Sequence, residues 1–106
     1  MNLSEESINA VALILTGDND KSPYMSGPKL VYFFREFGFS DIYGQGFPTR
    51  IYYSKENLLK INNKKLMRDV IYKILDNRRY IDTAYNVNNV IEYLNTFFKY
   101  DGYKVN

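Results

Sequence analysis

The sequence predicts an all-α protein, a compact bundle of four to five helices with one long ordered loop rich in glycine and aromatic residues. Apolar residues recur three and four positions apart in successive segments, which is typical of amphipathic helices. No segment shows the alternation of apolar and polar residues that marks a half-buried strand. Because 106 residues can bury a single core, we expect residues 1–106 to form one helical domain.

The first two helices are expected in the N-terminal third of the chain. Ser4 can cap a helix that carries two acidic residues in its first turn, and Gly17 can end it. A turn-rich loop follows, and Pro28 favours the start of a second helix. The apolar positions are Ile8, Val11, Ala12 and Leu15 in the first helix, and Leu30, Val31, Phe33, Phe34 and Phe37 in the second.

Three further helices are expected after residue 53. Ser54 favours the start of a short third helix, which Asn62-Asn63 ends. A fourth helix runs through residues 64–76, and a fifth runs from Asn86 to Lys99. Their apolar positions are Leu58, Leu59 and Ile61, then Leu66, Met67, Val70, Ile71, Ile74 and Leu75, and last Val87, Val90, Ile91, Leu94, Phe97 and Phe98. As an alternative, residues 51–53 and 103–105 pair as a very small β-ribbon.

The composition excludes several kinds of chemistry. The chain has no cysteine and no histidine, so disulfides, thiolate nucleophiles, Cys/His zinc sites and imidazole bases are absent. No glycine-rich phosphate loop is present, and no spacing of carboxylates indicates a catalytic pair. The apolar run near the N-terminus is too short to span a bilayer. We therefore expect a cytoplasmic, non-catalytic protein without a metal, a cofactor or a membrane partner.

The positive charge is concentrated in the middle of the chain. The net charge is +2, but residues 45–80 carry nine basic and three acidic residues. Basic residues interleaved with tyrosines can bind nucleic acid through phosphate contacts and base stacking. The alternative function is therefore a small nucleic-acid-binding domain that uses the basic face of residues 50–80. The candidate residues are Lys64, Lys65, Arg68, Lys73, Arg78 and Arg79.

One long motif resembles a known family. The run SGPKLVYFFREFGFSDIYGQGFPTR, at residues 26–50, is similar to an N-terminal domain of bacterial abortive-infection proteins of the AbiJ type. Arg78-Arg79-Tyr80 and Asp101-Gly102-Tyr103 match later marks of that pattern, and Thr49 stands where serine is usual. The resemblance covers nearly the whole chain. It implies a helical accessory module that precedes an effector, often a HEPN-type ribonuclease, in phage defence.

The resemblance leads to a functional expectation. HEPN chemistry needs a histidine, which this chain lacks, so the module itself is expected to be a non-catalytic sensor or adaptor. Its expected partners are a toxic effector, joined in cis or in trans, and a phage or host trigger protein. The chain is then the N-terminal module of a longer effector protein or a free-standing relative.

The loop after the second helix has two interpretations. Residues 37–53 contain three glycines and six aromatic residues, so the loop is expected to pack in one defined way. In the first interpretation it is a packed Ω-like loop that only stabilises the bundle. In the second it also forms a recognition surface. The residues exposed on that surface would be Asp41, Tyr43, Gln45, Thr49 and Arg50.

Overall fold

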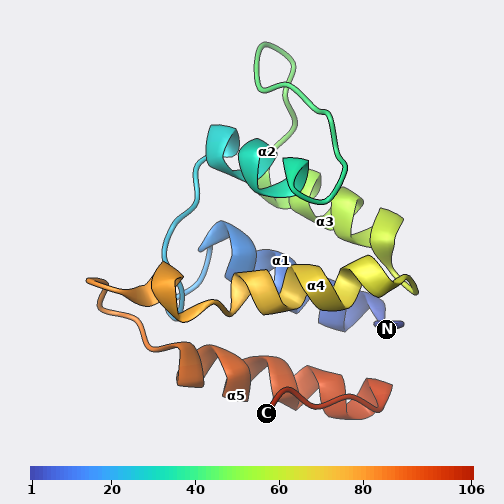
Figure 1. Ribbon diagram of the computed structural model, residues 1–106, viewed down its shortest axis with the longest axis vertical. Coiled ribbons are helices and arrows are strands. Elements are labelled where there is room, and N and C mark those ends of the chain that lie inside the picture. Colours follow the sequence, from blue (N-terminus) through green and yellow to red (C-terminus); the bar gives the residue numbers. More distant parts are fainter.

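The computed structural model describes residues 1–106 as five α-helices and two short 3-10 helices without a β-strand (Figure 1). The prediction of an all-α bundle is therefore confirmed. The α-helices are α1 (Glu5–Thr16), α2 (Gly27–Arg35), α3 (Arg50–Ile61), α4 (Lys65–Ile74) and α5 (Val87–Phe98). The 3-10 helices are η1 (Asn77–Tyr80) and η2 (Lys99–Asp101).

Helix α1 lies at the centre of the bundle. It contacts α3, α4 and α5, and Figure 1 shows α2 and α3 on one side of it and α5 on the other. Its apolar side chains are buried on more than one face, including Ile14, which the helical spacing assigns to a flank. A helix that is apolar on most sides belongs in the core. The first helix of the chain is thus the element on which α3, α4 and α5 pack.

The N-terminal end of α1 is held by the C-terminal part of the chain. The Asp101 carboxylate accepts hydrogen bonds from the Ser4 backbone N–H at 3.2 Å and from the Ser7 hydroxyl at 2.6 Å. Partial burial pushes the pKa of Asp101 upward, but the hydrogen bonds from Ser7 and Ser4 hold it below its usual value. Gly102 turns the chain in a left-handed conformation, with φ of 86°. The first helical turn therefore depends on residues near position 100.

The C-terminal end of α1 is held by two arginines from distant segments. Arg79 donates to the backbone carbonyls of Leu15 at 2.9 Å, Ile14 at 3.1 Å and Pro23 at 3.3 Å. The last carbonyls of a helix have no partner within the helix, so Arg79 helps to satisfy those of Leu15 and Ile14, the second of which also accepts from the Ser22 hydroxyl. Burial lowers the pKa of the Arg79 guanidinium, although the group remains a cation.

Arg50 makes the second set of contacts at this end. Its guanidinium donates to the Met25 carbonyl at 2.9 Å, to an Asp18 carboxylate oxygen at 3.0 Å, and to the Thr16 carbonyl. It also lies over the Tyr24 ring, 4.0 Å from its centroid. These contacts join the start of α3 to the end of α1 and to the loop that follows it.

Two predictions about residues 50–54 are wrong. The third helix begins at Arg50 and not at Ser54, because the Thr49 side chain caps it by accepting a hydrogen bond from the Tyr52 N–H at 3.3 Å. Ser54 is instead buried inside the helix. Residues 51–53 form the first turn of α3, so the β-ribbon with residues 103–105 does not exist.

None of the helices combines the length and the apolar character that a bilayer crossing requires.

Candidate recognition site

Residues 36–49 leave the end of α2, project beyond the helical body and return to α3 (Figure 1). Aromatic rings connect this loop to the core. Phe39 packs edge-on against the buried Phe34, with ring centroids 5.4 Å apart, and Phe47 lies 4.7 Å from Tyr53. Tyr43 in turn packs on Phe47 at 4.7 Å. The inner side of the loop is therefore packed, as both interpretations of the sequence require.

At Gly27 the loop approaches the first turn of α2 closely. A Cβ atom at Gly27 would lie 2.2 Å from Cε1 of the Tyr43 ring. No side chain can occupy that space unless Tyr43 moves. The absence of a side chain at position 27 thus allows the Tyr43 ring to cover the first turn of α2.

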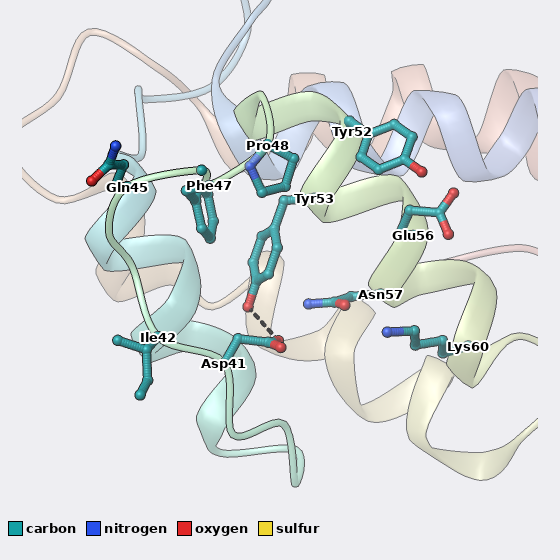
Figure 2. A pocket seen from close by; sticks show the side chains of 11 residues that line it. Asp41, Ile42, Gln45, Phe47, Pro48, Tyr52, Tyr53, Glu56, Asn57 and Lys60 are labelled. Atoms are coloured by element: carbon teal, nitrogen blue, oxygen red, sulfur yellow. Dashed lines mark hydrogen bonds between the residues drawn. The ribbon is translucent and has the colours of Figure 1, made fainter.

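An open pocket of about 430 Å³ lies between this loop and α3 (Figure 2). One wall comes from the loop and the other from the solvent-facing side of α3. The loop side chains are Asp41, Ile42, Gln45, Phe47 and Pro48, and the α3 side chains are Tyr52, Tyr53, Glu56, Asn57 and Lys60. We call this the recognition pocket.

A hydrogen bond fixes the width of the recognition pocket. The Tyr53 hydroxyl donates to the Asp41 carboxylate at 2.9 Å, which ties the loop to α3 (Figure 2). Burial, together with this bond, raises the pKa of Tyr53 to about 12, so the hydroxyl stays protonated and able to donate. Only one of the two Asp41 carboxylate oxygens takes part. The other oxygen remains available to a ligand.

Asn57 is the unusual residue of the recognition pocket. Its side chain is 2% exposed, and its amide nitrogen has no hydrogen-bond partner. Figure 2 shows that nitrogen directed toward Asp41 and Tyr53. It lies close enough to the Tyr53 hydroxyl to lower the pKa of that group, against the two larger effects, although the contact falls short of hydrogen-bond geometry. A buried donor without an acceptor is costly, and such groups are rare in folded proteins.

Other groups around the recognition pocket are also unpaired. Glu56 and Lys60 take part in none of the four ion pairs of the chain. Two large side chains that line it are more than half exposed, Ile42 at 81% and Tyr52 at 57%. The pocket therefore combines unpaired polar groups with apolar surface that water surrounds.

The five loop residues predicted from the sequence have different surroundings. Asp41 and Gln45 line the recognition pocket, and Tyr43 lies half-exposed above α2. Thr49 caps α3, and Arg50 faces the end of α1, so these two serve the fold. The α3 residues of the pocket were missed. Tyr52, Glu56 and Lys60 lie four residues apart on one helical face, a pattern that becomes visible only once the helix is known to begin at Arg50.

The six basic residues predicted from the sequence do not form one continuous face. Lys73 pairs with Glu36, and Arg78 pairs with Asp76. Arg79 is engaged with the end of α1. Lys64, Lys65 and Arg68 are exposed and belong to no ion pair. Of these six residues, the ones available to a ligand are thus confined to the start of α4.

Comparison of the chain with protein-family models, with curated proteins and with solved structures gave no match. Function must therefore be inferred from the residues themselves, of which the recognition pocket is the most distinctive group.

Proposed function

We propose that this chain is a non-catalytic recognition module that binds a partner protein at the recognition pocket. The unpaired amide nitrogen of Asn57 is the observation that carries the proposal. An unpaired buried donor costs about 1–3 kcal/mol, and an acceptor supplied by a ligand removes that cost. The exposed Ile42 and Tyr52, which line the same pocket, supply the apolar and aromatic surface that is common at the centre of protein interfaces.

The charges of the recognition pocket indicate what kind of segment binds there. Asp41 and Glu56 provide two carboxylates, and Lys60 provides one cation. A partner segment with a lysine or arginine side chain would pair with the carboxylates, and an adjacent backbone carbonyl would accept from Asn57. Apolar residues flanking that side chain would cover Ile42 and Tyr52. The proposed ligand is therefore a basic segment of a folded or extended partner protein.

The biological setting is proposed from the resemblance to the N-terminal domains of AbiJ-type abortive-infection proteins. In that setting the module is a sensor or adaptor in bacterial anti-phage defence. Its partner is a toxic effector, in cis or in trans, or the phage or host protein that triggers the effector. The nucleic-acid alternative in its original form, a broad basic face over residues 50–80, has less support because Lys73, Arg78 and Arg79 are engaged within the chain.

The proposal is tested by site-specific crosslinking in the source cells. A photo-reactive residue at position 42 should capture a defined partner protein. The same residue at position 81, where Ile81 is 63% exposed and does not line the pocket, should not. The captured protein is then purified, and its affinity is measured for the wild type and for Glu56→Gln. Loss of one carboxylate should weaken binding about tenfold.

Two controls make the result decisive. Ile42→Asp should abolish binding, and the matched Ile81→Asp should leave binding unchanged, while circular dichroism confirms that both variants are folded. Equal affinity of the wild type, Ile42→Asp and Glu56→Gln for the captured protein would rule out recognition at this pocket. A defence assay with the same variants then tests the biological setting separately.

A further inference from the structure

A second pocket, of about 450 Å³, lies between α4 and the C-terminal segment after η2. Its floor includes the buried Ile71, and tyrosine side chains from both elements line it, Tyr72 from α4 and Tyr103 from the segment after η2. It has no lining residue in common with the recognition pocket. We call it the α4 pocket.

The C-terminal wall of the α4 pocket is held in place by hydrogen bonds. Asn95 of α5 donates from its amide to the Val105 carbonyl at 2.8 Å and accepts from the Val105 N–H at 2.8 Å. The Tyr103 hydroxyl accepts from the Asn2 N–H at 2.9 Å, and the Tyr103 N–H donates to the Phe98 carbonyl at 2.9 Å. Residues 103–105 are therefore fixed, and the pocket exists before a ligand enters.

The charge of the α4 pocket has one sign only. Three cationic side chains line it, Lys65, Arg68 and Lys104, and no acidic residue does. None of the three takes part in the four ion pairs of the chain. Exposed cations gathered around an apolar floor without a counter-charge raise the local concentration of anions. A ligand for this pocket should carry more than one negative charge.

The α4 pocket also offers an aromatic surface beside that charge. Tyr72 is 56% exposed, and the Arg68 guanidinium lies 5.5 Å from the centroid of its ring. An exposed tyrosine ring can stack on a nucleobase, and a guanidinium can bind phosphate oxygens in pairs. A volume of about 450 Å³ is within the range of small-molecule sites. The positive charge, the aromatic surface and the volume of the α4 pocket thus suit a small anion that carries an aromatic ring.

We propose that the α4 pocket binds a nucleotide. Lys65, Arg68 and Lys104 bind its phosphates, and the base lies against Tyr72 and Tyr103. The nucleotide is either a free mononucleotide or the terminal nucleotide of a single-stranded RNA, since both present the same phosphates and base. The C-terminal contribution to this site, Lys104 and Tyr103, lies outside the basic stretch of residues 50–80 that the sequence singles out.

Calorimetric titration of the protein with AMP, ATP, inorganic phosphate and a 12-residue oligouridylate tests the proposal. Saturable binding of AMP or ATP, tighter than that of inorganic phosphate, is expected. Arg68→Gln and Lys104→Gln should each weaken it about tenfold, because each removes a charge-assisted contact to phosphate. Tyr72→Ala should weaken AMP binding and leave the weak binding of inorganic phosphate unchanged.

A matched control is Lys29→Gln, which removes an exposed cation of α2 that belongs to neither pocket and to no ion pair. Unchanged affinity in Lys29→Gln supports the assignment, and an equal loss in Lys29→Gln and Arg68→Gln overturns it. Saturable binding of the oligouridylate but of no mononucleotide, sensitive to Tyr72→Ala, identifies an RNA end as the ligand. The absence of binding to all four probes overturns the proposal. Oligouridylate binding that is insensitive to Tyr72→Ala and Lys104→Gln also overturns it.

Discussion

Polar groups are hydrogen-bonded at both ends of α1, but some of them are unpaired in the recognition pocket. At the ends of α1, Asp101, Arg50 and Arg79 satisfy backbone and side-chain groups with hydrogen bonds from distant parts of the chain. In the recognition pocket, the buried amide nitrogen of Asn57 has no partner, and Glu56 has no ion pair. The fold therefore completes the polar contacts at both ends of α1, whereas two buried polar atoms of α3, Ser54 Oγ and the Asn57 amide nitrogen, have no partner. Of these two residues only Asn57 lines the recognition pocket, which is where a ligand is expected.

The largest effect on the free energy of unfolding is expected from removing the hydrogen bonds at the C-terminal end of α1. Arg79→Ala removes the hydrogen bonds to the carbonyls of Ile14, Leu15 and Pro23. Bonds from a charged donor are stronger than neutral ones, and the Leu15 and Pro23 carbonyls would lose this donor, whereas the Ile14 carbonyl would keep the Ser22 hydroxyl at 2.7 Å. We therefore expect the free energy of unfolding to fall by about 3 kcal/mol. Urea denaturation measures this change. The neighbouring Arg78→Ala, which removes a side chain that is 84% exposed, should leave the free energy of unfolding nearly unchanged.

A smaller, pH-dependent effect is expected at the other end of α1. Asp101→Ala removes the acceptor of the Ser4 and Ser7 hydrogen bonds and should lower the free energy of unfolding by about 2 kcal/mol at pH 7. The pKa of Asp101 is lower in the folded protein than its usual value of 3.8, so the unfolded chain binds this proton more readily. The contribution of Asp101 is therefore complete above pH 3.8 and is lost as the pH falls through the folded pKa.

Urea denaturation at a series of pH values between 2 and 7 measures this dependence. The difference between the wild type and Asp101→Ala should shrink toward the acid end of the series. Asp69→Ala, which removes an exposed carboxylate of α4 that is in no ion pair, should show no such trend. A difference that is constant with pH would mean that Asp101 acts through its packing and not through its charge.

The smallest expected effect is an increase in the free energy of unfolding, and it concerns Asn57 in the recognition pocket. Asn57→Leu replaces an unpaired buried amide with an apolar side chain of similar size, so the free energy of unfolding should rise by about 1 kcal/mol. The same substitution should abolish capture of the partner protein, because the donor is lost. Asn9→Leu, at an exposed position of α1, serves as the control for a general effect of leucine. A clear loss of stability in Asn57→Leu would show that the Asn57 amide is part of the fold and would weaken the functional proposal.

Local patterns in the sequence predict much of the fold. Ser4 and Gly17 bound α1 as expected, and the apolar spacing from Leu66 to Ile74 locates α4. The start of α3 was misplaced because both Thr49 and Ser54 are residues that cap helices, and only the packing of Tyr53 under the loop distinguishes them. Local spacing decides which segments become helices, and tertiary contacts decide where they begin.

The candidate sites depend on contacts that sequence spacing does not contain. Arg50 and Arg79 are separated from their carbonyl partners in α1 by 34 and 64 residues. The sequence therefore does not show that these two arginines form hydrogen bonds within the fold. Lys104 was not included in the basic group because the fold, and not the sequence, brings it beside Lys65 and Arg68. Asn57 carries no local motif at all. Its unpaired state is a property of burial and becomes visible only in three dimensions.

The contacts at the start of α1 have a consequence for how the chain folds during synthesis. Ser4 bonds with Asp101, which lies 97 residues later, so the central helix cannot be completed until almost the whole domain has left the ribosome. Contacts with such large sequence separation form slowly, because the loop between them must first be closed. The first helix to be synthesised is thus among the last to reach its final state. We expect the domain to acquire its fold in one cooperative step after Asp101 has left the ribosome, and not helix by helix.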